Sequence, residues 1–156
     1  MGKKAQIITA LPGHIGPIGQ NVREADKLEF AANMRTAEQV MAAGLKISTV
    51  AWTGLVDDVP VCMFGVAPAG SIFIAEYGRP WMVGTRLLDD VAVLFLRRCR
   101  GQIKEMLDLY PVLSNYVAAS NTQAIRWLRW LGFKVSDFPV PMGIRAVPFL
   151  HFELGR

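Results

Sequence analysis

One stretch, residues 115–133 (NYVAASNTQAIRWLRWLGF), constrains the fold more than any other because it changes from the period of a strand to that of a helix. Up to about Ser120 the residues alternate in polarity, which is typical of a half-buried strand. Asn121 is then suited to be a helix N-cap and Gly132 a left-handed C-terminal cap. Between these caps, apolar residues recur at helical spacing: Ile125, Leu128 and Leu131. We therefore expect a strand that leads directly into a short helix ending on glycine.

Composition favours one compact domain preceded by a short arm. The chain has 156 residues, of which 52% are hydrophobic and 19% charged, which is enough for one core. The first twenty residues contain Pro12, Pro17 and four glycines, a content that favours irregular backbone. We expect residues 1–20 to form an irregular arm, with room for a short strand at residues 6–10, and residues 21–156 to form a single domain.

The charge pattern argues against a membrane span and does not favour nucleic acid. The net charge of +4 comes from basic residues spread along the chain, with no run longer than Lys3 and Lys4. The longest uncharged stretch, residues 59–75, contains two prolines and two glycines, which break a spanning helix. We therefore expect neither a membrane span nor nucleic acid as the partner.

Cysteine and histidine usage predicts no metal site. Cys62 and Cys99 have no paired spacing, and the chain has only two histidines. Buried, reduced thiols are the expected state, and they suit a cytoplasmic setting.

The rest of the pattern predicts an ordered series of helices and strands. Asp57 and Asp58 separate two apolar, β-branched runs in the manner of a hairpin turn, and Pro68 begins a break that extends to Ser71. The expected elements are helices at residues 22–34 and 36–44, strands at 48–56, 59–66, 72–75 and 79–84, a long helix at 87–110 and a closing strand at 149–154.

Three residues mark the ends of the first two helices. Asn21, with Glu24 three residues later, has the spacing of a capping box, and Thr36 is suited to cap the second helix. Gly44 is suited to end that second helix. The two helices should form a helical hairpin.

In this order the elements resemble the GNAT acyltransferase fold, an α/β fold with a mixed, mostly antiparallel central sheet flanked by helices. The family's helix motif has an Asn, an Ala three residues later and Gly-Phe eleven and twelve residues later. The matching residues are Asn121, Ala124, Gly132 and Phe133. The resemblance implies a GNAT-like fold.

Longer segments resemble the internal virion protein A family of short-tailed bacteriophages, a GNAT-like branch. Between residues 21 and 154 these segments are TVAWTGLVDDVPVCMFGVAP, RPWMVGT and SNTQAIRWLRWLGF. This resemblance implies a bacteriophage structural or morphogenesis protein, located in the virion or in the host cytoplasm during assembly. The implied partners are other virion proteins, with a homo-oligomer as a further option.

The resemblance to active acetyltransferases implies an alternative function, the transfer of an acetyl group from acetyl-CoA to an unknown amine. If acetyl-CoA binds, the resemblance places its contacts on Trp81, Met82, Val83, Asn115 and Asn121. For Asn121 a simple N-cap is the competing interpretation. Asn115 needs a polar partner in either case, since an unpaired amide in a half-buried strand costs about 1 to 3 kcal/mol.

Two features weigh against that activity. The loop that should hold the pyrophosphate, residues 85–90, has a single arginine, and Asp89 and Asp90 stand where a helix N-terminus would attract the anion. The family often uses a Tyr as general acid, whereas the matching residue here is Leu128, which has no proton to donate. We therefore expect a degenerate scaffold that needs no cofactor. By location alone, the remaining catalytic candidates are Tyr110 and Tyr116 as acids, and Glu76, Asp89 and Asp90 as bases.

The helix of the opening stretch also carries candidates for partner binding. Trp127 and Trp130 cannot both face the core of so short a helix, so one of them should project outward beside Arg126 and Arg129. Tryptophan and arginine dominate interface hot spots, although a tryptophan half covered at the sheet edge explains the pattern equally well. The arginines of both long and short helices also allow a nucleic-acid patch, but such charges usually form a solvated face.

Overall fold

Among the residues that the structure describes, the chain folds around a sheet in which one pair of neighbouring strands is parallel and the others are antiparallel. The computed structural model describes residues 2–71 and 73–156. The eight strands lie in the order β1-β2-β3-β4-β5-β8-β6, with β7 paired to β8. β4 and β5 are parallel, and the other pairs are antiparallel. The predicted α/β architecture with a mostly antiparallel sheet is therefore confirmed. The strands are β1 Ala5–Thr9, β2 Val50–Val56, β3 Val59–Ser71, β4 Ile74–Gly84, β5 Val112–Ala118, β6 Lys134–Val135, β7 Val140–Met142 and β8 Val147–Gly155.

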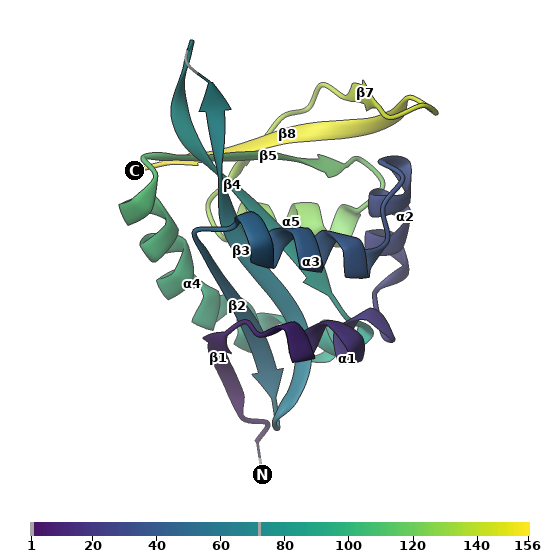
Figure 1. Cartoon of the computed structure of the whole chain (residues 1–156), viewed down its shortest axis with the longest axis vertical. Helices are drawn as coiled ribbons and strands as arrows, with labels where there is room; N and C mark the ends of the chain where they lie inside the picture. The colour runs from purple at the N-terminus through teal and green to yellow at the C-terminus, as the bar shows by residue number, and fades with distance from the viewer. Residues whose placement is uncertain (1, 72) are drawn as a thin grey trace.

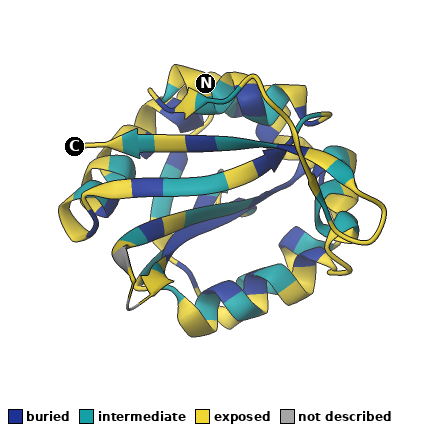
Figure 2. Cartoon of the chain, turned by 90° about the horizontal axis from the view of Figure 1, so that it is seen from above, coloured by how far each residue is buried: buried dark blue, intermediate teal, exposed yellow. Residues whose placement is uncertain are grey.

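Helices cover both faces of this sheet (Figure 1, Figure 2). One layer holds α1 (Ile15–Gly19), α2 (Glu24–Ala32) and α3 (Ala37–Ile47), and the other holds α4 (Ala92–Leu109) and α5 (Thr122–Trp130). Each layer closes its own core against the sheet. No helix among the described residues is long and apolar enough to cross a membrane.

The hairpin of β2 and β3 forms as the sequence predicts. Asp57 and Asp58 occupy its turn with φ angles of 49° and 65°, and a two-residue type I′ turn requires positive φ at both central positions. Aspartate tolerates this region better than most residues, which explains its presence at both positions.

The expected break after β3 is wrong. β3 continues to Ser71, and together with β4 it projects beyond the helical layers (Figure 1). Pro68 is tolerated there because β2 pairs with β3 only as far as Val66, so a proline beyond that point removes no ladder hydrogen bond to β2. Ile72, the first residue of the next predicted strand, lies outside the described residues.

The N-terminal residues are not an irregular arm. β1 pairs with β2 along its whole length, and Ile18 of α1 is completely buried in the core under α1 and α3. Pro17 lies inside the single short turn of α1, where its missing N–H disrupts no long helix. Residues 5–19 thus extend the sheet and cover one of its faces.

Helix ends follow the sequence signals in part. Thr36 caps α3, since its hydroxyl accepts a hydrogen bond from Gln39 N at 3.2 Å and its own N–H donates to Gln39 Oε1 at 2.9 Å. The predicted stop at Gly44 is wrong, because α3 continues to Ile47. The indole of Trp81 packs directly against Gly44, so a close approach explains this glycine.

The opening stretch forms the predicted strand and capped helix. β5 leads into α5, whose N-cap Asn121 accepts a hydrogen bond from Ala124 N at 3.4 Å. Gly132 has a φ of 101°, and the N–H groups of Gly132 and Phe133 donate to Arg129 O and Leu128 O, both at 3.0 Å. This is the hydrogen-bond pattern of a Schellman end, as the Gly-Phe pair predicts.

Candidate functional site

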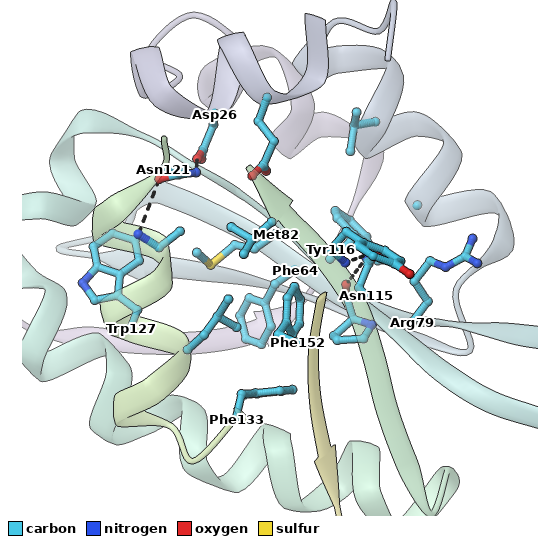
Figure 3. A pocket seen from close by; sticks show the side chains of 18 of the residues that line it. Asp26, Phe64, Arg79, Met82, Asn115, Tyr116, Asn121, Trp127, Phe133 and Phe152 are labelled. Carbon is cyan, nitrogen blue, oxygen red and sulfur yellow. Dashed lines mark hydrogen bonds between the residues drawn. The ribbon is translucent and has the colours of Figure 1, made fainter. Parts of the chain in front are cut away.

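β4 and β5 separate from each other and leave a hollow between them. The two strands pair only at Gly78 and Leu113, after which they diverge. A cavity of about 460 Å³ occupies the opening. Residues from both helical layers line it, so the opening passes through the sheet (Figure 3).

Separated strands expose backbone groups that a closed sheet would pair. On β4, Gly84 N donates to Asp26 Oδ2 at 2.9 Å, and Pro80 O accepts from Asn115 Nδ2 at 2.8 Å. Because backbone groups alternate in direction along a strand, the N–H and C=O of Met82 also point into the opening. Proline supplies no donor at position 80, so Gly84 and Met82 carry the two N–H groups of this edge.

On the facing edge of β5, backbone N–H groups also donate hydrogen bonds to side chains. Ala118 N donates to Glu29 Oε1 at 2.6 Å, and Tyr116 N donates to Asn115 Oδ1 at 2.8 Å. Asn115 therefore has the polar partners predicted for it, and both are backbone groups. Through Asp26 and Glu29, α2 bridges the two strands where they lie apart.

A buried arginine links three elements at the end of the opening. Arg23, the residue before α2, is 5% exposed. Its Nη1 contacts Asp26 Oδ1 at 3.1 Å, and its Nε contacts Asp89 Oδ1 at 3.3 Å. Its Nη2 donates to Gln123 Oε1 at 2.8 Å, and its guanidinium carbon lies 4.7 Å from the centre of the Trp127 ring. Arg23 thereby fills the gap between the loop after β4 and helix α5.

The segment before α2 also reaches β4 directly. Arg23 N donates to Gly84 O at 3.0 Å, and Val22 forms an isolated bridge with Thr85. The capping box predicted for Asn21 and Glu24 is therefore wrong: Asn21 Nδ2 donates to Pro17 O at 3.3 Å, and Arg23 is the N-cap residue. Pairing of this segment with β4 determines where α2 begins.

Two carboxyl groups of α2 have raised pKa values. Burial raises the pKa of Asp26, while the Arg23 charge, Gly84 N and Asn121 oppose that rise. Asn121 Nδ2 donates to Asp26 Oδ1 at 3.2 Å. Burial raises the pKa of Glu29 from 4.5 to about 7, against the hydrogen bond from Ala118 N. Glu29 thus changes its charge near neutral pH at the edge of the cavity.

The middle of the opening is apolar. Figure 3 shows Asp26 and Asn121 at one end, Arg79 and Tyr116 at the other, and aromatic and sulfur-containing side chains between them. The apolar lining on the side of α4 and α5 includes Phe64, Met82, Phe95, Trp127, Leu128, Phe133 and Phe152.

The residues proposed as acetyl-CoA contacts do not all reach this space. Trp81, Met82, Asn115 and Asn121 line the cavity. Val83 does not line the cavity; it is completely buried in the core on the face of α1 and α3. Adjacent strand residues point to opposite faces, so Val83 and Met82 could not both face the same layer.

Asp89 and Asp90 precede helix α4 and do not lie at its N-terminus as the sequence predicted. Residues 86–91 form a 3₁₀ helix, and α4 begins after Val91 with neither Asp89 nor Asp90 in its first turn. Asp89 binds Arg23 instead of the helix terminus. Three amides of this loop already have backbone partners: Thr85 N donates to Val61 O, Arg86 N to Asn21 O and Leu88 N to Thr85 O.

The predicted acids and bases are scattered. Tyr116 lines the cavity with 39% of its surface exposed, whereas the hydroxyl of the buried Tyr110 lies 2.6 Å from Thr49 Oγ1. Glu76 and Asp90 are exposed and lie outside the cavity lining. Leu128, which stands at the family's tyrosine position, lines the cavity.

The candidates for partner binding divide between the cavity and the surface. Trp127 is half-buried and lines the cavity, while Trp130 is 42% exposed. Arg126 and Arg129 are exposed, and Arg129 Nη2 lies 3.9 Å from Asp137 Oδ1. The prediction that one tryptophan projects outward is confirmed for Trp130. The described residues contain no group of three or more side chains suited to a metal ion.

The sequence interpretation missed Arg23, Asp26 and Glu29. In α2, the apolar Leu28 is 62% exposed whereas the charged Asp26 is 4% exposed. The available signal was the spacing of three residues, which places the three charged side chains on one face of a helix. Their partners are up to 100 residues away, and no local pattern reveals them.

Comparisons with known proteins identify the fold. No protein-family model and no curated protein matches the sequence. Among solved structures, spermidine N-acetyltransferase from Vibrio cholerae, in complex with CoA and spermine, superposes with a TM-score of 0.68 and 9% identity over 97% of this chain and 95% of that chain. A putative acetyltransferase from Salmonella typhimurium with acetyl-CoA gives 0.66 and 13% over 97% and 93%. An aminoglycoside N(6')acetyltransferase from Legionella pneumophila gives 0.67 and 11% over 99% and 94%.

These similarities establish the GNAT fold. In this chain, side chains of α2 bridge β4 and β5 where the two strands lie apart.

Proposed function

We propose that this chain is a non-catalytic protein on the GNAT fold, with its acyl-CoA channel closed by its own side chains, and that it acts by binding other proteins. The observation that carries this proposal is the buried network of Arg23, which joins Asp26, Asp89 and Gln123 across the end of the opening.

Coenzyme A does not fit the residues at this place. A bound pyrophosphate needs free N–H donors and a positive field. Here the amides of Thr85, Arg86 and Leu88 have partners, and Asp89, whose carboxylate contacts Arg23, adds negative charge to the same loop. The strand amides of Gly84 and Ala118 donate to carboxylates of α2. Entry of the cofactor would require the loss of these contacts together with displacement of a buried guanidinium.

The proposed partners and location rest on the sequence resemblance to the internal virion protein A family. We propose that the chain is a structural or morphogenesis protein of a bacteriophage particle, present in the virion and in the host cytoplasm during assembly. Its partners would be other virion proteins or a second copy of itself. Mass spectrometry of particles purified to constant composition should detect the chain, and its consistent absence would contradict this assignment.

A thermal-shift titration tests the closed channel. A ligand at a hundredfold its Kd stabilises a native protein by about 2.7 kcal/mol, which is about 5 to 10 °C for a chain of this size. We expect millimolar acetyl-CoA or CoA to leave the Tm unchanged, with the Vibrio cholerae enzyme as the positive control. A saturable increase in Tm would contradict the proposal.

N-acetyl transfer is the second candidate function, because the strands do part and Glu29 lies at the edge of the opening. A carboxyl group with a pKa of about 7 is suited to accept a proton from an amine at neutral pH. This candidate requires acetyl-CoA binding, so the same titration separates the two functions.

A further inference from the structure

A second groove lies on the outer surface, between α4, the end of α5 and β8. Its volume is about 440 Å³, and it shares Ile103 and Leu131 with the lining of the opening between β4 and β5. Its half-buried apolar side chains form its floor, and the exposed Gly132 also lines it; the floor residues are Ile103, Leu107, Leu131 and Leu154. Its rim is formed by Arg100, Lys104 and Trp130.

The rim is positively charged and partly preorganised. The Arg100 guanidinium carbon lies 4.2 Å from the centre of the Trp130 ring, so a cation–π contact holds the head group at the groove. Among the described residues no carboxylate forms an ion pair with Arg100 or Lys104. At about 100° per residue, Glu105 lies about 140° around α4 from Arg100, away from the groove.

Further cations lie at both ends of this rim. Arg97 is exposed one turn before Arg100 on the same side of α4. At the other end, the side chain of Arg156 donates to Leu107 O at 2.7 Å and to Asp108 O at 3.2 Å. Asp108 lies one turn after Lys104 on α4.

We propose that this groove binds an acidic amphipathic peptide segment of a partner protein. An aliphatic or aromatic side chain would occupy the floor, and carboxylates on either side of it would pair with Arg100 and Lys104. An apolar centre with a polar rim, and with tryptophan and arginine at the contact, is the usual arrangement of an interface hot spot. The inference rests on the proposed protein-binding function and names its surface.

The floor favours a peptide over nucleic acid. Single-stranded nucleic acid stacks its bases on exposed aromatic faces, but Arg100 already covers one face of Trp130. The rest of the floor is aliphatic, which matches protein side chains better than bases and phosphates.

A peptide-display library with random sequences, selected on the full chain, tests the proposal. We expect the enriched peptides to combine at least two acidic residues with a large apolar residue. Binding of the synthesised peptides should weaken at least tenfold in the double variant Arg100→Glu, Lys104→Glu, and also in Trp130→Ala. The matched control is Arg98→Glu, Lys46→Glu, which changes the net charge equally at exposed positions away from the groove and should retain binding.

Three results would overturn the inference: no enrichment, enriched peptides without acidic residues, or equal weakening by the two double variants. Binding of a fluorescent oligothymidine that is lost in Arg100→Glu, Lys104→Glu, without peptide enrichment, would assign the groove to nucleic acid instead. All the substituted residues are exposed in the native protein, and unchanged Tm values would verify that the variants fold. Failure here leaves the closed channel intact, because the coenzyme A titration is independent of this surface.

Discussion

The opening between β4 and β5 has a polar end and an apolar middle, and the two parts differ in whether their exposed groups have bonding partners. At the end near Gly84, Asp26 and Arg23 form a buried, hydrogen-bonded network with Asn121, Asp89 and other polar groups. In the middle, apolar side chains surround a hollow of about 460 Å³. The opening between β4 and β5 is therefore closed by hydrogen bonds and ion pairs at one end and remains a cavity at its apolar centre.

This difference follows from the unequal cost of the two kinds of exposed group. An unpaired buried N–H costs about 1 to 3 kcal/mol, so the freed amides of Gly84 and Ala118 need acceptors in the absence of a ligand. The apolar side chains of the hollow lose only packing contacts and need no specific partner, although the backbone N–H and C=O of Met82 also point into this part of the opening. Carboxylates from α2 meet the first need, and the second part of the opening remains a cavity.

Among the substitutions that test this difference, removal of Asp26 should cause the largest loss of stability. Asp26→Ala leaves the buried Arg23 without its i+3 partner and leaves Gly84 N and Asn121 Nδ2 without an acceptor. We expect the free energy of unfolding to fall by about 3 to 5 kcal/mol in urea denaturation. Glu24→Ala, an exposed position on the same helix, is the control and should change it by less than about 0.5 kcal/mol. Similar losses in both variants would show that the network contributes little.

The pH dependence of stability should reveal Glu29. Its pKa is about 7 in the native state against 4.5 ordinarily, so between these values the native protein holds a proton that the unfolded chain has released. The stabilising contribution is present below pH 4.5 and is lost as the pH rises through 7. Glutamine does not titrate, so Glu29→Gln lacks this loss. As the pH rises from 4.5 to 7, we expect the free energy of unfolding of Glu29→Gln to increase by about 1 to 3 kcal/mol relative to that of the wild type.

Chemical denaturation at several pH values would measure this difference. Glu24→Gln removes an exposed carboxyl from the same helix and is the matched control. A constant difference between Glu29→Gln and the wild type across the pH range would contradict the raised pKa of Glu29.

Two glycine substitutions should have opposite and smaller effects. A Cβ added at Gly84 would lie 3.1 Å from Leu88 Cδ2 and 3.3 Å from both Arg23 Cδ and Asp26 Oδ2, so Gly84→Ala should destabilise by about 1 to 3 kcal/mol. Gly101 in α4 has no atom within 4 Å of such a Cβ, so Gly101→Ala should stabilise by about 0.5 to 1 kcal/mol. Stabilisation by both variants, measured as Tm, would mean that the closed end is loosely packed.

Local signals in the sequence predict the elements whose cause is local. The positive φ values at Asp57 and Asp58, the capping box of Thr36 and the Schellman end at Gly132 each depend on neighbours a few residues away. The resemblance of residues 115–133 to the GNAT helix motif likewise leads to the correct fold. These features could be predicted because backbone conformation at a turn or cap is determined by its own residues.

The errors concern residues whose role depends on distant partners. Gly44 is a glycine because Trp81 packs on it, and the charged residues Arg23 and Asp26 are buried because the separated strands need acceptors. The short strand allowed at residues 6–10 is present as β1, but residues 1–20 as a whole were expected to be irregular because proline and glycine suggest loops, whereas β1 pairs with the edge of β2. Contacts with residues distant in the sequence determine which residue types occur at these positions, and a single sequence does not reveal those contacts.

Amide hydrogen exchange at Gly84 and Ala118 tests the central claim most directly, since these are the two strand amides that the carboxylates of α2 bind. The account predicts that both exchange slowly in the free protein and that millimolar acetyl-CoA changes neither rate. It also predicts that Asp26→Ala accelerates exchange at Gly84 more than at Ala118. Fast exchange of both amides in the free protein, with protection only when acetyl-CoA is added, would contradict the account and identify an open cofactor site.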